Sequence, residues 1–123
     1  MGCDIRVVFE EQVWPSQWAK LFSAPLWRDY ELFTKLAGVR GNVNDKCISP
    51  PRGLPEDVSP ETRAELSWSG YHSHSWITWE EFSQWFPASD IREATDFETA
   101  FWLARKCVGA LERECRVVFA FDS

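Results

Sequence analysis

The sequence predicts an α+β domain in which a small, mostly antiparallel sheet contains both terminal strands and is packed by a long C-terminal helix and shorter helices. Three observations lead to this prediction. The tetrapeptide RVVF occurs near both ends of the chain, and residues 28–41 and 95–114 each carry apolar residues at helical intervals. At 123 residues the chain is long enough for one hydrophobic core, so we treat residues 1–123 as a single domain.

The two terminal strands are predicted from residues 5–11 (IRVVFEE) and 115–121 (CRVVFAF), whose β-branched and aromatic residues favour extended structure. We expect these two segments to be neighbouring strands of one sheet. No wider self-similarity accompanies the shared tetrapeptide, so the match indicates similar strand chemistry and not a duplicated repeat.

Between the strands, residues 28–41 predict a first helix whose end is marked by Gly38 and Gly41, because glycine readily adopts the left-handed conformation found after a helix. Residues 42–60 are rich in Asn, Asp, Gly and Pro and predict a long loop. Proline is favoured in the first turn of a helix, so we expect a short helix over about residues 60–68, ended by Gly70.

Two capping-box pairs, in which a threonine precedes a glutamate by three residues, predict two later helices. The first pair, Thr78 and Glu81, follows a short extended stretch and predicts one or two helical turns. The second pair, Thr95 and Glu98, opens the longest predicted helix. One face of that helix carries an apolar stripe that we expect to pack on the sheet: Phe97, Phe101, Ala104, Val108 and Leu111.

Composition excludes several classes of function. The 13 basic and 19 acidic residues give a net charge of −6, whereas duplex-binding proteins need a positive field, so long nucleic acids are not expected partners. No apolar run is long enough to cross a bilayer and no export signal is present, so we expect a cytoplasmic protein without a membrane partner. In that reducing compartment, cysteines without C-x-x-C spacing are expected to be free thiols, largely buried: Cys3, Cys47, Cys107 and Cys115.

The chain's two histidines, His72 and His74, are one residue apart, and a regular extended segment would point both to the same face. The pair admits three interpretations: a metal site, a catalytic acid–base pair, or histidines that hydrogen-bond to the backbone or a loop. Zinc would need further ligands, and the candidates Cys3, Asp4 and Asp57 are distant in the sequence without motif spacing. We therefore expect no metal and no cofactor.

The residues beside the histidines give no further catalytic group. Ser73 and Ser75 adjoin them, but adjacent side chains diverge on a strand, so neither serine is expected to be a nucleophile. Glu80 and Glu81 are interpreted as the solvated first turn of a helix, with no catalytic role. Most Trp and Phe residues are expected in the core. Trp76 is the exception, because beside the histidines its indole can stack on a planar base.

Arg52 lies in a proline-rich loop, PPRGLPEDVSPE, whose prolines reduce the entropy of holding one shape. A guanidinium group can bind two oxygens of a phosphate or carboxylate at once, so a stiff loop that presents one arginine suits anion recognition. The alternative is an arginine that pairs internally with Glu56 or Asp57.

The chain resembles a family of small phage and prophage proteins that open with the sequence MGCDIH. The resemblance rests on segments spread over nearly the full length: MGCDIR, DYELFTKLAGVRG, RGLPEDVS, HSHSW and RVVFAFDS. It implies a phage-encoded accessory protein that acts in the bacterial cytoplasm, and small phage proteins of this sort often counter host defence. Arg6 stands where the family usually has histidine. Were that histidine a metal ligand together with His72 and His74, the arginine would remove it.

These observations lead to one functional hypothesis with two alternatives. We expect Arg6, Arg52, His72, His74 and Trp76 to form one wall of a pocket for a phosphate-bearing ligand. The protein would sequester a nucleotide-derived immune signal, such as a cyclic ADP-ribose derivative or a cyclic dinucleotide, without catalysis and as a homodimer or higher oligomer. One alternative is a phosphodiesterase that uses both histidines. The other is an inhibitor of a host protein that binds through an acidic, Trp-rich surface.

Overall fold

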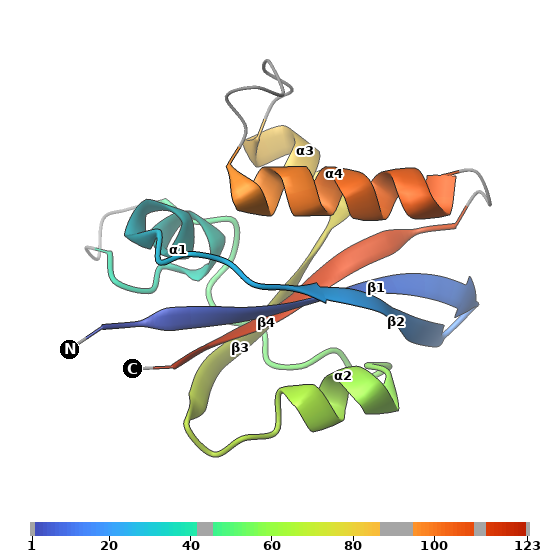
Figure 1. Cartoon of the computed structure of the whole chain (residues 1–123), viewed down its shortest axis with the longest axis horizontal. Coiled ribbons are helices and arrows are strands. Elements are labelled where there is room, and N and C mark those ends of the chain that lie inside the picture. Colours follow the sequence, from blue (N-terminus) through green and yellow to red (C-terminus); the bar gives the residue numbers. More distant parts are fainter. Residues whose placement is uncertain (1, 42–45, 87–94, 110–112, 123) are drawn as a thin grey trace.

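The protein folds around a four-stranded antiparallel sheet with the strand order β2-β1-β4-β3 (Figure 1). The computed structural model describes residues 2–41, 46–86, 95–109 and 113–122. The terminal strands form the central pair of the sheet, which confirms the predicted α+β class. The strands are β1 (Asp4–Trp14), β2 (Gln17–Ala24), β3 (Tyr71–Thr78) and β4 (Cys115–Asp122).

Four helices flank the sheet in the described part of the chain: α1 (Tyr30–Ala37), α2 (Pro60–Glu65), α3 (Trp79–Trp85) and α4 (Asp96–Gly109). Helix α1 begins after Asp29, whose side chain accepts a hydrogen bond from the Leu32 amide, and it ends at Gly38 with φ of 76°. Both capping boxes form as predicted, at Thr78 for α3 and at Thr95 for α4. Helix α2 ends at Leu66, earlier than predicted, and Leu111 lies outside the described residues.

Strand β2 was not predicted from the sequence. Two prolines in the segment around it argued against a long helix, but Pro15 and Pro25 lie just outside the strand and do not interrupt it. Proline has no amide hydrogen to donate to a sheet, so it is tolerated at strand ends. The β1–β2 hairpin turns through Ser16, whose φ is 64°, and the pairing carries an irregularity between Phe9 and Glu10.

The first face of the sheet, which we call the α4 face, is covered by α1, α3 and α4 (Figure 1). Its core is aromatic. Phe101 is fully buried and its ring lies 4.7 Å from that of Phe82 and 5.3 Å from that of Phe9. Phe33 of α1 packs edge-on against Phe121 of β4. The predicted α4 stripe is therefore confirmed for each of its described members.

The opposite face, which we call the α2 face, is covered by α2 and the loop before it (Figure 1). Its apolar cluster is small and comprises Val8, Leu66, Val118 and Ala120, with Leu54, Tyr71 and Trp76 packed around it. Polar side chains take much of the remaining area, including Glu10 and Arg116, which are buried at 0% and 4% exposure. The two faces are thus held by different interactions.

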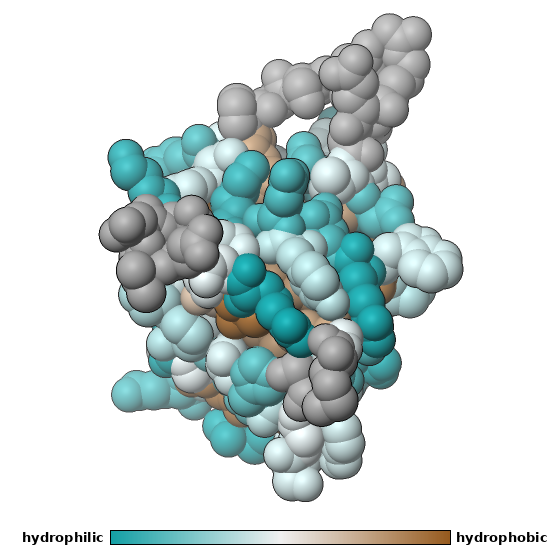
Figure 2. All heavy atoms as spheres, turned by 90° about the vertical axis from the view of Figure 1, so that its left-hand side faces the viewer, coloured by the Kyte–Doolittle hydropathy of each residue, from teal (hydrophilic) through white to brown (hydrophobic). Residues whose placement is uncertain are grey.

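The tryptophans depart from the expectation that they lie in the core. All eight belong to the described part of the chain and none is fully buried; Trp14, Trp27, Trp68 and Trp102 are exposed. The phenylalanines, which have no polar atom to satisfy, fill the core instead. Seen from the end at which both termini lie, polar side chains dominate the surface and apolar atoms show in narrow strips between them (Figure 2).

The four cysteines are free, as expected, but only Cys3 and Cys115 are buried. Burial raises the pKa of the Cys115 thiol to about 12, with Arg105 lowering it and Glu114 raising it by smaller amounts. Among the described residues, no helix is long and apolar enough to cross a membrane.

Candidate ligand-binding site

The histidine segment is not a regular strand. The register of β3 against β4 shifts between His72 and Ser75, and Ser73 has a positive φ of 55°. One residue is therefore inserted, and such a bulge reverses the faces of the side chains that follow. His72 pairs with Phe121 of the aromatic core, whereas the His74 ring meets Leu66 of the α2 face. The prediction that both histidines share a face is wrong.

Each histidine has a local partner. His74 Nε2 donates a hydrogen bond of 2.9 Å to the backbone carbonyl of Leu66, which anchors the end of α2 to β3. His72 Nδ1 lies 2.9 Å from the Ser73 hydroxyl, and its ring lies 6.4 Å from that of Phe121. For His74 the interpretation as a backbone-bonded histidine therefore describes the structure. The catalytic alternative lacks its pair, because an acid and a base must face the same substrate.

Arg6 lies on the α2 face but away from Arg52. Its Nε donates to the Glu65 carboxylate at 3.0 Å, and the same carboxylate accepts hydrogen bonds from Lys20 at 2.7 Å and Ser23 at 2.6 Å. Burial disfavours the charged form of Glu65, but the hydrogen bonds from Lys20, Ser23 and Arg6 outweigh this effect and lower its pKa. Arg6 thus ties α2 to the sheet.

Arg52 lies against the outer edge of β3. The Arg52 amide donates to the Ser75 hydroxyl at 3.1 Å, and the Gly53 amide donates to the His74 carbonyl at 2.8 Å. Gly53 has φ of 80°, a conformation that glycine adopts without strain. This backbone contact gives the edge strand partners and fixes where the arginine side chain begins.

The Arg52 guanidinium pairs internally with Glu81, and not with Glu56 or Asp57, the partners named in the alternative interpretation of the sequence. Nη1 donates to Glu81 Oε1 at 2.8 Å and to the Trp76 carbonyl at 2.9 Å, and Nη2 donates to Glu81 Oε2. These contacts raise the pKa of Arg52 and lower that of Glu81. Glu81 is half-buried, so its assignment to a solvated first turn is corrected, whereas Glu80 is exposed.

Trp76 and a second tryptophan alternate with two arginines. The Arg52 guanidinium carbon lies 4.8 Å from the centre of the Trp76 ring, and the Arg116 guanidinium carbon lies 6.0 Å from the same ring. Arg116 also lies 3.9 Å from the Trp18 ring centre. Cations over indole faces are attracted by the ring's electron density, so this arrangement stabilises both guanidinium groups beside aromatic rings.

These side chains line a cleft of about 680 Å³ between the 52–57 loop and the α2 face of the sheet. Two of the five predicted site residues, Arg52 and Trp76, line the cleft. The other lining residues were not predicted as site residues: Ser16, Leu54, Pro55, Glu56, Asp57 and Arg116. The lining includes the guanidinium groups of Arg52 and Arg116 and the indole of Trp76. Glu56 and Asp57 of the loop add two carboxylates. The cleft can therefore offer an aromatic face, an anion-binding group and hydrogen-bond acceptors to one ligand.

A buried polar network holds the loop beside the cleft. Glu10 accepts hydrogen bonds from Arg116, from the Ser59 amide and from the Thr62 hydroxyl, at 2.8, 3.0 and 2.8 Å. Arg116 also donates to Asp57 at 2.8 Å. The sequence held a signal for this pair: aligning the two RVVF segments antiparallel, as Val8 opposite Val118, places Glu10 opposite Arg116.

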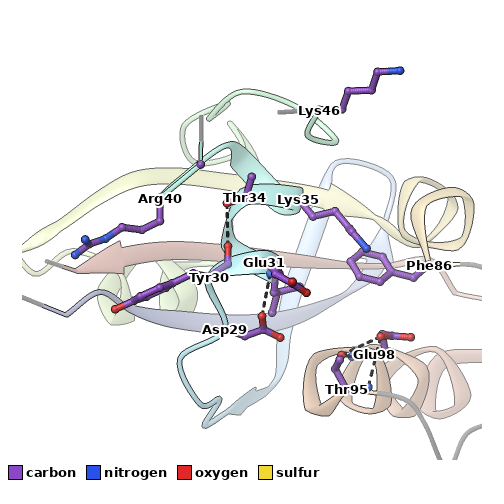
Figure 3. Close-up of a pocket in the computed structure, with 12 residues that line it drawn as sticks. Asp29, Tyr30, Glu31, Thr34, Lys35, Arg40, Lys46, Phe86, Thr95 and Glu98 are labelled. Atoms are coloured by element: carbon purple, nitrogen blue, oxygen red, sulfur yellow. Dashed lines mark hydrogen bonds between the residues drawn. The ribbon is translucent and has the colours of Figure 1, made fainter. Parts of the chain in front are cut away.

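A second hollow, of about 540 Å³, lies over α1 and the starts of the neighbouring elements (Figure 3). Its acidic groups mostly serve helix ends: Asp29 caps α1 and Glu98 completes the capping box of α4. Lys35 lies over the Phe86 ring, and Lys46 points away from the other labelled side chains (Figure 3). Because these charges do not converge, the hollow is a weaker candidate than the cleft.

The side chains weighed as further metal ligands have other roles. Asp4 pairs with Arg28, Asp57 pairs with Arg116, and Cys3 is fully buried. Within residues 2–41, 46–86, 95–109 and 113–122, no group of three or more His, Cys, Asp or Glu side chains is arranged to hold a metal ion.

Comparison of the chain with family models, with curated proteins and with solved structures found no match.

Proposed function

We propose that the protein is a phage-encoded counter-defence protein that sequesters a nucleotide-derived signal in the cleft beside Trp76, without catalysing a reaction. The observation that carries the proposal is the juxtaposition of an indole and two guanidinium groups on one cleft of about 680 Å³. Indoles stack on nucleobases and guanidinium groups bind phosphate oxygens, so this combination suits a nucleotide.

The cleft also contains the carboxylates of Glu56 and Asp57, which would repel a phosphate placed beside them but can bind other parts of a nucleotide. Asp57 is paired with Arg116, which also pairs with Glu10, and Glu56 is exposed on the loop. A carboxylate accepts hydrogen bonds from the N–H groups of a base, whereas a phosphate would bind at Arg52. The ligand would then lie with its base toward the loop and its phosphate toward the N-terminal end of α3.

The phage setting comes from the resemblance to the family that opens MGCDIH and stays a prediction. The homo-oligomeric state also stays a prediction, and light scattering of the purified protein measures it. The identity of the nucleotide is open between a cyclic ADP-ribose derivative and a cyclic dinucleotide, because stacking and phosphate contacts are common to both.

The proposal is tested by incubating the purified protein with cyclic ADP-ribose derivatives and cyclic dinucleotides, removing unbound ligand, heating the protein and analysing the released molecules by mass spectrometry. An intact nucleotide supports sequestration, a cleaved one indicates an enzyme, and no retained nucleotide contradicts the proposal. Arg52→Ala and Trp76→Ala should each weaken nucleotide binding about 10- to 100-fold, the range expected for one charge-assisted hydrogen bond or one stacked ring. Arg63→Ala is the matched control, since Arg63 is exposed on α2 and does not line the cleft.

A second candidate function is inhibition of a host protein, and exposed tryptophans favour it. Trp27 and Trp14 expose 85% and 69% of their surface, and Trp is enriched at the centres of protein interfaces. With a net charge of −6, the partner surface would be basic. Trp27→Ala would then abolish capture of a basic host protein while Trp76→Ala would not, which is the reverse of the pattern expected for the nucleotide cleft.

A further inference from the structure

We propose that Glu81 gates the cleft: its carboxylate holds Arg52 over the Trp76 ring, and a ligand phosphate must displace that carboxylate to bind. This inference rests on the proposed function and adds a regulatory residue to it. Glu81 is not among the residues that line the cleft, so its influence acts through Arg52. It is therefore a positioning residue.

The geometry of Arg52 defines the closed state. Two of its nitrogen atoms, Nη1 and Nη2, face the Glu81 carboxylate, and Nη1 also donates to the Trp76 carbonyl. The guanidinium carbon lies 4.8 Å from the centre of the Trp76 ring, so the cation covers an indole face that a base would need. A single movement of Arg52 would uncover the ring and free its donors for a phosphate.

The exchange is chemically reasonable because carboxylate and phosphate compete for the same donors. A guanidinium group binds either anion through two parallel N–H···O bonds. The Arg52 and Glu81 side chains are 24% and 28% exposed, so a ligand in the cleft can reach the pair without unfolding the surrounding structure. A phosphate group of the ligand offers the same two-oxygen geometry to the Arg52 donors, whereas a neutral ligand would leave the gate closed.

Glu81 also has a structural role that a substitution must preserve. Its Oε1 accepts a hydrogen bond from the Thr78 amide at 3.1 Å, which completes the capping box of α3. In Glu81→Gln, the amide oxygen can keep this bond, because glutamine is also found at this capping position. The amide nitrogen would then face Arg52 Nη2, and two donors cannot bond each other. The variant therefore removes the opposing charge and the Nη2 hydrogen bond, leaving Arg52 held only by the Nη1 bonds to the residue-81 side-chain oxygen and the Trp76 carbonyl, without removing the helix cap.

The experiment measures the affinity of ADP by isothermal titration calorimetry for the wild-type protein, Glu81→Gln and Glu80→Gln. Glu80 is the matched control, since it lies on the same helical turn, is exposed, and its substitution changes net charge equally. We expect Glu81→Gln to bind ADP about tenfold more tightly than wild type, and Glu80→Gln to differ less than twofold. Adding Arg52→Ala to Glu81→Gln should remove the gain.

Each outcome decides the inference. Equal affinities for Glu81→Gln and Glu80→Gln contradict the gate, and if the wild-type protein still releases an intact nucleotide on heating, the proposed function survives that failure. Absence of ADP binding in all variants contradicts the gate, and together with no released nucleotide it contradicts the proposed function as well. Glu81→Asp provides a second variant that retains the charge but withdraws it by one methylene, so an intermediate gain supports the gate and no gain opposes it. Thermal unfolding of each variant checks that the fold is intact.

Discussion

The two faces of the sheet are built by different physical means, although they share the same four strands. On the α4 face, aromatic rings from three helices and the sheet interlock, as in the contacts of Phe101 with Phe9, Phe82 and Phe97. On the α2 face, carboxylates and arginines replace most of this apolar contact, centred on Glu10 and Arg116. The difference indicates that the α4 face supplies most of the stability, whereas the α2 face shapes the candidate site.

The physical reason is that apolar burial and ion pairing differ in specificity and strength. Buried apolar area contributes roughly 25 cal/mol per Å² and tolerates many side-chain combinations. A buried ion pair contributes little net stability, because desolvation offsets most of its attraction, yet breaking it strands a charge. Ionic contacts therefore suit a face whose loop must hold one conformation beside a ligand.

The largest effect should come from the α4 face. Phe101→Ala removes a fully buried ring with four aromatic neighbours and should lower the free energy of unfolding by about 4 kcal/mol. Leu103→Ala, on the exposed side of the same helix at 47% exposure, is the control and should change it by less than about 1 kcal/mol. Urea denaturation at pH 7 measures both. Equal losses would contradict the assignment of the main core to this face.

A smaller loss is expected from the centre of the α2 face. Glu10→Gln leaves Arg116 buried with only Asp57 to balance its charge, and it should cost about 3 kcal/mol, measured by the same denaturation. Exposed Glu56→Gln is the control.

The double variant Glu10→Leu with Arg116→Met sharpens this comparison. Removing both charges should recover part of the loss, because no buried charge remains and Asp57, which loses Arg116, is 36% exposed and can be hydrated, while the Ser59 amide and Thr62 hydroxyl still lose their acceptor. If the double variant is less stable than Glu10→Gln, the hydrogen bonds around Glu10 and Arg116 contribute to the free energy of unfolding in their own right, and not only by balancing a buried charge.

The smallest effect concerns the dependence of stability on pH. The pKa of Glu65 is lower in the folded protein than its ordinary value of 4.5, so its contribution is fully present above pH 4.5 and is lost as the pH falls through the folded pKa. Glu65→Gln should therefore be less stable than wild type at pH 7 and should lose less stability between pH 5 and pH 3. Denaturation at several pH values measures this difference. Glu61→Gln, exposed on the same helix, should keep the wild-type slope.

Local features of the fold could be predicted because neighbouring residues encode them. Gly38 ends α1 and the Thr78–Glu81 box starts α3, in each case through hydrogen bonds that span only a few residues. Strand β2 was missed because its residues are only half-buried and its bulge interrupts the alternation that identifies a strand. The candidate site could be predicted in part: Arg52 and Trp76 line one cleft, but Arg6, His72 and His74 do not, and the bulge at Ser73 places the two histidines on opposite faces.

The sequence by itself determined the α+β class, the adjacency of the terminal strands and the positions of the helix caps, since these depend on strand composition, apolar periodicity and short-range hydrogen bonds. Only the tertiary structure decided which carboxylates Arg52 and Arg6 meet. Arg52 pairs with Glu81, 29 positions away, and Arg6 pairs with Glu65, 59 positions away, because loop and helix docking bring these side chains together. Ion-pair partners depend on which side chains lie close together in the folded protein, and the order of residues along the chain does not specify those distances.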